Sequence, residues 1–431
     1  MSFPRYPKYK ESGVEWLGQV PEHWGINQGR RLFLQEREPS REGDDQLSAT
    51  QKYGVVPQKL FMEMEDQKVT LALGGTDNFK HVEKGDFVIS LRSFQGGIEY
   101  SNYQGCVSPA YTVLRPSLPI CSQFWAYLLK SKSYIEALQT MTDGIRDGKN
   151  ISYQQFGQIR LPVPAIDEQT AIANFLDRET AKIDGLIAEQ ERLIELLKEK
   201  RQAVISHAVT KGLNPDAPMK DSGIEWLGQV PEHWEIRKMS HFFRAGKGKN
   251  GQMLTKEFCG ANAGDYPVYS GQTENDGIMG TWDQFEFDFG ERGVLFSTTV
   301  GAKAMHLRQL FGQFSLSQNC MIIWSTSEQC ETRFYYYHFQ PLFQFERALI
   351  PDHMQASFRI EDLYGYKVAV PSVDEQLAIA VHLDAETAQF DTLTTEAQKA
   401  ITLLQERRSS LISAAVTGQI DVRGIQHQEA A

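Results

Sequence analysis

Polar side chains gather in four short segments of this chain, two in each half, and three of these segments also contain glycine. They lie at 91–97 and 144–152, and again at 297–303 and 352–359. Arginine, lysine, glutamine and asparagine can form paired hydrogen bonds with guanine and adenine edges, and glycine lets a backbone approach a phosphate closely. The candidate DNA-contacting residues are Arg92, Ser93, Gln95, Arg146, Lys149, Asn150, Ser297, Thr298, Lys303, Gln355 and Arg359. Such loops are usually plain surface turns, so it is their matched placement in both halves that favours contact with DNA.

The motifs expected of an enzyme are missing. There is no Asn-Pro-Pro-Tyr, which residues 214–217 imitate poorly, and no Gly-x-x-x-x-Gly-Lys-Ser/Thr phosphate loop. The ten histidines include no His-Glu-x-x-His, and the carboxylates form no recognisable nuclease set. We therefore predict no catalytic residue and no metal site. The five cysteines are odd in number and lack metal-type spacing, which favours free thiols in a reducing cytoplasm.

Short buried strands precede the polar loops in both halves. Residues 85–90 and 293–297 are typical of such strands, and 111–114 and 321–324 predict further strands. Amphipathic helices follow in both halves, so each half is expected to hold a mixed α/β domain. The strands match between the two halves, whereas the turns after them differ.

Two blocks that flank these domains occur twice. Residues 10–24 return at 220–234, and residues 164–169 return at 371–376. A repeat this long indicates a duplicated domain with a spacer rather than a solenoid. Four tryptophans of the first block and its copy are expected to be structural, tucking the chain against each domain: Trp16, Trp24, Trp226 and Trp234.

Each second block begins a long helix without proline, from 167 to about 211 and from 374 to Gly418. Asp-Glu at the start suits a helix N-terminus, and Gly212 and Gly418 are expected to end the helices. Apolar residues spaced alternately four and three apart predict a coiled-coil seam, in which the two helices pair antiparallel. The scaffold residues of this predicted pair are Ile172, Leu176, Ile183, Leu186, Leu193, Leu197, Ile379, Leu383, Phe390, Leu393, Leu404 and Leu411. Some 40 helical residues would form a spacer of roughly 60 Å, longer than one turn of DNA at roughly 34 Å.

The net charge of −11 is spread unevenly. Residues 25–160 sum to +1 and residues 235–367 to −2, so the remaining −10 lies in the repeated blocks and helices. DNA binding needs a local basic patch rather than a basic whole. The composition thus permits DNA binding without requiring it. No apolar run approaches the roughly 18 residues of a membrane span, and a cytoplasmic protein is expected.

The tryptophan blocks and the Asp-Glu-Gln helix starts, each present twice, resemble the specificity subunit of Type I restriction–modification enzymes. The resemblance implies an α/β (α+β) fold with an internal pseudo-two-fold repeat, in which a pair of long antiparallel coiled-coil helices separates two target recognition domains. The expected boundaries are a Trp-box segment at 1–24, target recognition domains at 25–160 and 235–367, long-helix regions at 161–213 and 368–421, a linker with the second Trp box at 214–234, and a tail at 422–431.

The resemblance also implies partners and a division of labour. This chain would bind a bipartite site in double-stranded DNA, together with two modification (methyltransferase) subunits and two restriction (translocase/nuclease) subunits. S-adenosylmethionine, ATP and Mg would be cofactors of those partners, which would methylate adenine N6 and cleave DNA. Two alternatives stay open: a self-contained methyltransferase or nuclease with unrecognised motifs, and a coiled-coil adaptor between two protein ligands.

Overall fold

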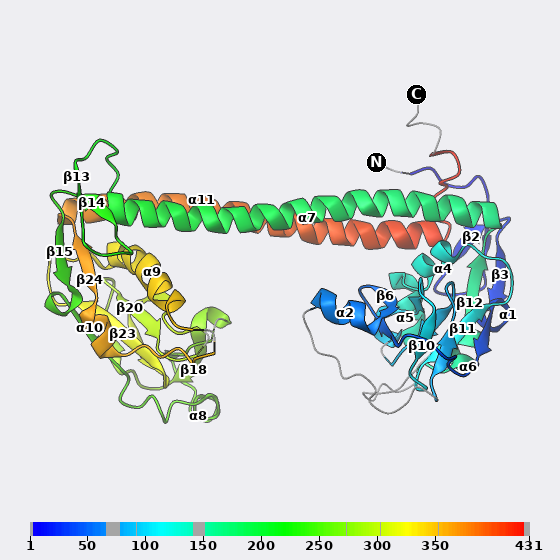
Figure 1. Ribbon diagram of the computed structural model, residues 1–431, viewed down its shortest axis with the longest axis horizontal. Coiled ribbons are helices and arrows are strands. Elements are labelled where there is room, and N and C mark those ends of the chain that lie inside the picture. The colour runs from blue at the N-terminus through cyan, green and yellow to red at the C-terminus, as the bar shows by residue number, and fades with distance from the viewer. Residues whose placement is uncertain are drawn as a thin grey trace. The chain divides into compact units, whose positions relative to one another are not determined.

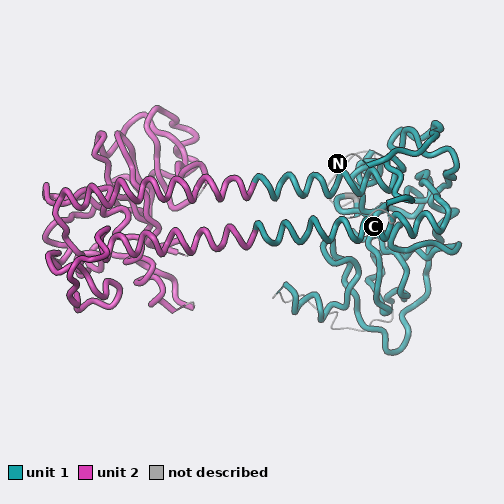
Figure 2. The backbone as a smooth tube through the Cα atoms, turned by 90° about the horizontal axis from the view of Figure 1, so that it is seen from above, with its two compact units in different colours: residues 1–190, 399–431 teal, residues 191–398 magenta. Residues whose placement is uncertain are grey.

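The computed structural model of the chain (Figure 1) describes residues 3–65, 78–91, 93–140, 151–272, 274–301, 303–351 and 353–425. The chain divides into two compact units (Figure 2): unit 1 holds residues 1–190 and 399–431, and unit 2 holds residues 191–398. Each unit therefore contains part of both long helices. No helix within the described ranges is long and apolar enough to cross a membrane.

Unit 1 is built on a four-stranded antiparallel sheet in the order β4-β11-β8-β9. Four two-stranded antiparallel pairs surround it: β1·β2, β3·β12, β5·β6 and β7·β10. The strands are β1 Tyr9–Glu11, β2 Gln19–Pro21, β3 Gly25–Gln28, β4 Phe33–Glu36, β5 Leu47–Thr50, β6 Gly54–Pro57, β7 Lys80–Val82, β8 Phe87–Ile89, β9 Glu99–Tyr100, β10 Gly105–Val107, β11 Thr112–Pro116 and β12 Arg160–Val163. The shorter helices are α1 Gly29–Leu32, α2 Gln58–Glu65, α3 Ser93–Gly96, α4 Ser122–Leu128, α5 Lys132–Thr140 and α6 Tyr153–Gln158.

Unit 2 repeats the central sheet in the order β16-β23-β20-β21 and adds a second one, β18-β17-β22-β19, in which β17 and β22 are parallel. The strands are β13 Met219–Asp221, β14 Gln229–Pro231, β15 Glu235–Lys238, β16 Phe243–Gly246, β17 Tyr266–Tyr269, β18 Ile278–Trp282, β19 Phe287–Asp288, β20 Val294–Thr298, β21 Leu307–Leu310, β22 Gln313–Leu316, β23 Cys320–Ser325 and β24 Lys367–Val370. The helical segments are η1 Met239–His241, α8 Lys256–Ala261, η2 Asn275–Gly277, α9 Thr332–Ala348 and α10 Ile360–Gly365.

The two units share one frame and differ in what is inserted into it. The pairs β1·β2 and β3·β12 of unit 1 correspond to β13·β14 and β15·β24 of unit 2, and the four-stranded sheets have the same order of strands. All four predicted strands are present, as β8, β11, β20 and β23, and helices follow them in both units. The mixed α/β fold class is thus confirmed. Among the described residues, the β5·β6 and β7·β10 pairs occur in unit 1 alone and the second four-stranded sheet occurs in unit 2 alone.

The two predicted long helices are α7 Ile166–Lys211 and α11 Val373–Val416. They run side by side in both views (Figures 1 and 2), and they are antiparallel within each unit. Unit 1 combines the first part of α7 with the last part of α11, and unit 2 does the reverse. Gly212 and Gly418 follow the helix ends with φ of +74° and +75°, as predicted. A side chain at Gly418 would also clash with Pro21.

The apolar cores lie between the central sheets, the shorter helices and the long helices. Trp24 and Trp234 are fully buried in the cores of units 1 and 2, and Trp16 and Trp226 pack against them, which supports the structural role expected of the tryptophan blocks. The five cysteines are free; four of them are buried and Cys121 is partly exposed.

Candidate nucleic-acid interface

The duplicated motifs meet in space, where they fix the start of each long helix. His23 of the first tryptophan block lies 2.8 Å from Glu168 in the first turn of α7, measured from Nε2 to Oε2. The copy repeats this contact, with His233 Nε2 2.9 Å from Glu375 Oε2 in the first turn of α11. The histidine and the glutamate are more than 140 residues apart in both copies, so each block alone gave no sign of this pairing.

The glutamine of each Asp-Glu-Gln motif is buried and ties its helix to the neighbouring domain. Gln169 Oε1 accepts hydrogen bonds from the Cys121 amide at 3.0 Å and from the Trp125 indole Nε1 at 3.1 Å. Its Nε2 donates to the carbonyl oxygen of Pro164 at 2.9 Å. Because Cys121 precedes α4 and Trp125 lies within it, one amide side chain joins α4 and the strand end before α7 to the helix itself.

Gln376 plays the same part in unit 2. Its Oε1 accepts from the Glu331 amide at 2.8 Å, and its Nε2 donates to the carbonyl oxygens of Gln329 and Pro371. Glu331 is the residue before α9, so the frame holds both domains in the same way.

The helix seam repeats every seven residues, as predicted, but half of its positions differ from the prediction. Ile172, Leu176, Ile183, Leu197, Ile379, Leu383, Phe390 and Leu411 are buried and Leu404 is half-buried, whereas Leu186, Leu193 and Leu393 are exposed. The buried or half-buried seam of α7 consists of Leu176, Thr180, Ile183, Ile187, Gln190, Ile194, Leu197, Arg201, Val204 and Ala208. That of α11 consists of Leu383, Thr387, Phe390, Thr394, Ala397, Ile401, Leu404, Arg408, Leu411 and Ala415.

Each α11 seam residue lies 207 positions after its α7 counterpart, so the corrected seam obeys the repeat throughout. The prediction placed every second seam residue one position too early. In α7, apolar residues stand next to each other at 186–187 and 193–194, and either spacing then satisfies the sequence pattern. Packing against α11 selects the second residue of each pair.

Four exposed leucines outside the seam form two matching pairs. Leu186 and Leu403 are exposed in unit 1, and Leu393 and Leu196 are exposed in unit 2. The shift of 207 residues relates Leu186 to Leu393 and Leu196 to Leu403. Each unit therefore carries the same pair of exposed leucines on its portion of the helices.

A large basic groove lies in unit 2 between α7, α9 and the chain from 303 to 308. This groove, called groove 2 here, has a volume of about 1310 Å³. Its described lining residues include one carboxylate, Glu199, and five basic side chains, which are Lys198, Arg201, Lys303, Arg308 and Arg347. Such a concentration of positive charge on one concave surface suits the phosphates of a nucleic acid.

His306 lines groove 2, and the positive charge of the groove affects its pKa. Burial, and then the charges of Arg308 and Lys303, lower the pKa of His306 below its ordinary value. The imidazole is therefore mostly neutral at neutral pH and gains a proton only at lower pH.

Unit 1 has a smaller groove in the corresponding place. Groove 1 has a volume of about 390 Å³ and is lined by Gln95, Lys130 and Lys132 among others, and by Ser409 of α11. Ser409 lies 207 residues after Gln202, which lines groove 2, so both grooves lie against equivalent positions of the helix pair. The structure thus places two predicted residues, Gln95 and Lys303, in equivalent grooves.

The two candidate loops of unit 2 are in direct contact. The Phe358 amide donates to the carbonyl of Thr299 at 2.7 Å, and the Gly301 amide donates to the carbonyl of Ala356 at 3.0 Å. Gln355 and Arg359 flank this pairing and are exposed, and Arg359 immediately precedes α10. This contact places the two loops side by side, so that they can contribute to one binding surface.

Three of the other predicted residues are buried and cannot reach a ligand in this conformation, and four lie outside the described residues. Ser93, Ser297 and Thr298 are buried. Their hydroxyls bond within the fold: Ser93 accepts from the Ser90 amide, and the hydroxyls of Ser297 and Thr298 donate to backbone carbonyls. We therefore do not propose that these three residues contact DNA. Arg92, Arg146, Lys149 and Asn150 lie outside the described residues.

A family model matches both halves of the chain, over residues 29–196 and 231–403, and its description is "Type I restriction modification DNA specificity domain". The chain belongs to this family. Each matched segment runs from the start of a mixed α/β domain into the long helix that follows it, so the family's domain is the repeated unit of this chain.

Individual specificity subunits are similar to this chain over different extents. The EcoKI specificity subunit of Escherichia coli K12 is 32% identical over 128 residues, which cover 30% of this chain and 25% of that subunit. The MjaVIII specificity subunit of Methanocaldococcus jannaschii is 24% identical, over 58% of this chain and 56% of that subunit. The putative MjaX specificity subunit of the same organism is 20% identical, over 96% of this chain and 98% of that subunit.

Solved structures of the family share the fold. One chain, from a structure described as "Structural basis underlying complex assembly and conformational transition of the type I R-M system", has a TM-score of 0.70 at 12% identity, covering 92% of this chain and 98% of that one. The HsdS subunit from Thermoanaerobacter tengcongensis has a TM-score of 0.52 at 13% identity, covering 95% of this chain and 99% of that one.

Proposed function

We propose that this chain is the DNA-specificity subunit of a Type I restriction–modification complex. Target recognition domains at 25–160 and 235–367 each read one half of a bipartite, asymmetric DNA site. Partner subunits carry out adenine-N6 methylation and ATP-dependent cleavage. The observation that carries this proposal is the repeated frame, which holds two domains of the same sheet order but with different inserted strands and different loops. One frame with two dissimilar readers suits two unlike half-sites, and the repetition of an antiparallel helix pair within the frame suits half-sites on opposite strands.

The two grooves supply the contact with the DNA backbone, and the loops beside them read the bases. Groove 2, with Lys303, Arg308 and Arg347 on its wall, is suited to phosphates, whose neutralisation releases counterions and makes binding salt-dependent. Lys303 and Gln95 are the candidates that line grooves 2 and 1, respectively. Gln355 and Arg359, and the loop residues Arg92, Arg146, Lys149 and Asn150, complete the set proposed to contact DNA.

The paired long helices are proposed to set the distance between the half-sites. Helix α7 has 46 residues, and a rise of about 1.5 Å per residue gives it a length of about 69 Å. That is about two turns of B-form DNA at roughly 34 Å each. Lengthening α7 and α11 together by seven residues each, so that the seam is kept, should therefore widen the unspecified spacer between the half-sites or abolish activity.

Catalysis is assigned to partners that dock on the duplicated helix surfaces. The exposed pair Leu186 and Leu403 and its repeat Leu393 and Leu196 offer two equivalent apolar patches, and two equivalent patches suit two copies of one modification subunit. S-adenosylmethionine, ATP and Mg would then be bound by the modification and restriction subunits. Leu403→Asp should weaken docking of one copy, and Leu196→Asp that of the other. An assembly that keeps both copies in the double variant, by native mass spectrometry, would remove these patches from the proposal.

The decisive experiment exchanges one reader. Residues 25–160 are replaced by the corresponding segment of a relative with a different site, and genomic methylation is mapped in cells that also express the partner subunits. One half-site should change and the other stay as it was. Alteration of both halves would refute independent reading, and methylation or cleavage by the purified chain alone would refute the assignment of catalysis to partners.

A further inference from the structure

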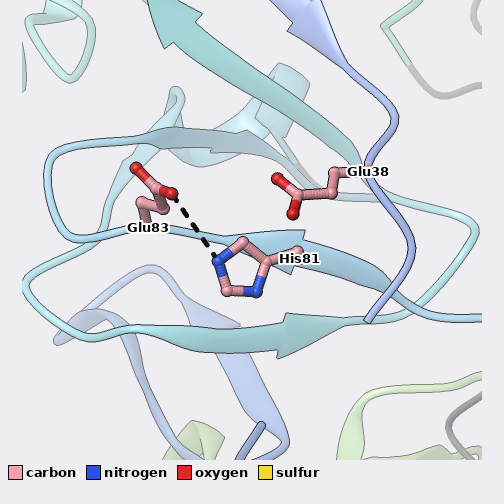
Figure 3. Close-up of side chains that lie close together, drawn as sticks. All are labelled: Glu38, His81 and Glu83. Atoms are coloured by element: carbon pink, nitrogen blue, oxygen red, sulfur yellow. Dashed lines mark ion pairs between the residues drawn. The ribbon is translucent and has the colours of Figure 1, made fainter. Parts of the chain in front are cut away.

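Three ionisable side chains of unit 1, none of which lines groove 1, lie close together in the first reader. Glu38 follows β4, His81 lies on β7, and Glu83 comes directly after β7 (Figure 3). Their backbones are held together, because the His81 amide donates to the carbonyl of Glu38 at 2.8 Å and Pro39 bridges to Lys80. One imidazole nitrogen and one oxygen from each carboxylate all lie within 4.8 Å of one another.

The buried imidazole presents a free nitrogen to this cluster. The side chain of His81 is fully buried, and its Nδ1 lies 2.7 Å from Oδ2 of Asp44. Because a carboxylate only accepts hydrogen bonds when ionised, it fixes the proton on Nδ1 and leaves the lone pair on Nε2. Nε2 is buried and finds no hydrogen-bond partner among the described residues. It faces Glu83, 3.9 Å from Oε1, as the dashed line in Figure 3 marks.

This arrangement is the one that metal-binding histidines adopt. A ligating imidazole commonly donates its other N–H to a carboxylate, which sets the tautomer and raises the basicity of the ligating nitrogen. An unpaired buried nitrogen is otherwise costly. Carboxylates on the open side of the imidazole supply the remaining ligands and the negative charge that a cation requires.

Arg41 occupies the space between the two carboxylates. Its Nε lies 2.6 Å from Glu38 Oε1 and its Nη2 lies 3.1 Å from Glu83 Oε1. The Arg41 side chain is 45% exposed, so it can swing into solvent without disturbing the core. Arg115 is farther away, with Nη1 3.9 Å from Glu38 Oε2, and it is held by Asp86 at 2.9 Å.

We propose that Glu38, His81 and Glu83 bind one divalent transition-metal ion, with Arg41 as the cation that it displaces. One imidazole with two carboxylates suits Zn²⁺ and its neighbours in the first transition row. Metal–ligand bonds of about 2.0–2.2 Å place adjacent tetrahedral ligand atoms about 3.4 Å apart. The ligand atoms, which lie within 4.8 Å of one another, therefore need to close by at most about 1.4 Å, which the partly exposed carboxylates allow. A fourth position is left for water.

The ion would lock the segment after β4 to β7 within the first reader. The described part of unit 2 contains no comparable group of ligands, so the two readers would differ in their response to metal. This inference concerns the stability of one reader, and it stands or falls independently of the proposed DNA-specificity function.

The test uses the full chain, freed of metal by a chelator and titrated with Zn²⁺ by calorimetry and with Co²⁺ by visible absorption. One ion per chain is expected, with Co²⁺ giving d–d bands of a low-coordinate site. Glu83→Gln should weaken binding by about 10–100-fold or more, the range seen when even a group that supports a ligand is changed. Asp44→Asn should fall within that range. Glu42→Gln, which changes an exposed carboxylate of the same loop, is the matched control and should leave binding unchanged.

The Arg41→Gln variant distinguishes two interpretations of the cluster, a metal site and a network of ion pairs. If Arg41 competes with the ion, its removal should tighten Zn²⁺ binding by roughly ten-fold or more, because an opposing positive charge is gone. His81→Gln should abolish binding, and the exposed Arg41 and Glu83 variants keep the test valid where His81→Gln fails to fold. Binding by Glu83→Gln as tight as in the wild type, or no binding by either the wild type or Arg41→Gln, would overturn the proposal.

Discussion

Replacing Gln169 by leucine should loosen the first reader from the start of α7. The leucine fills a similar volume but leaves two donors without their acceptor: the Trp125 indole N–H, which is buried, and the Cys121 amide, which is partly buried. An unsatisfied buried donor costs about 1–3 kcal/mol, so the indole alone predicts a loss of about 1–3 kcal/mol in the free energy of local opening, and the partly buried amide adds a smaller amount. Native-state hydrogen exchange, followed by mass spectrometry of peptides covering 118–129, measures that free energy directly.

The chain offers two matched controls for this change. Gln405→Leu alters an exposed glutamine of α11 and should change the opening free energy by no more than about 0.5 kcal/mol. Gln376→Leu leaves one partly buried donor, the Glu331 amide, without its acceptor, so it should produce a smaller loss in peptides covering 328–335 of unit 2 and leave unit 1 unaffected. A loss below 1 kcal/mol for Gln169→Leu, or a loss spread evenly over both units, would refute the argument that this side chain joins the reader to the helix.

Three further predictions test the corrected seam and groove 2. Ile194→Ala should lower the free energy of unfolding by about 2–5 kcal/mol, as for other buried isoleucines, whereas Leu193→Ala, at 41% exposure against 9% for Ile194, should cost less than about 1 kcal/mol in urea denaturation; equal losses would restore the original seam. Lys303→Gln and Arg308→Gln should each reduce the slope of log K against log salt by about 1 in fluorescence-anisotropy titrations of the assembled complex, and an unchanged slope would exclude them from phosphate contact. Burial and neighbouring positive charge lower the pKa of His306 in the free protein, and nearby phosphates would raise it again, so the complex takes up protons and DNA affinity should increase as the pH falls through the pKa that His306 has in the complex; His306→Gln should lose that increase, and a variant with the wild-type pH profile would contradict it.

Features set by local pattern could be predicted from the sequence. The strands that became β8 and β20, the ends of α7 and α11 at Gly212 and Gly418, and the burial of Trp24 all follow from periodicity, turn chemistry and repetition. The period of the seam was equally clear, because a seven-residue repeat leaves a strong signature. Its exact positions were not clear, since Ile194 and Leu193 serve the pattern equally well and only the facing helix distinguishes them.

Features set by distant contacts could not be predicted in the same way. His23 and Glu168 belong to two separate motifs, and nothing in either motif says that they meet. The hydroxyl of Ser297 could contact DNA by its chemistry, but β20 is buried along its whole length. The sequence of a short strand with polar residues at its end does not predict that burial. The cluster around His81 was missed because its ligands come from two segments some 40 residues apart, with no metal-type spacing.

Unit 1 is assembled from both ends of the chain, and this has a consequence for how the protein is made. The Asp421 amide donates to the carbonyl of Pro4, and Gln419 donates to the carbonyl of Gln19, so residues translated after unit 2 complete a unit that was begun before it. A ribosome adding about 5–20 residues per second needs roughly 10–50 s to travel from residue 190 to the end of α11. Throughout that interval Ile172 and Leu176 await their helical partner, and a prematurely terminated product would emerge with unit 2 complete and unit 1 open to proteolysis.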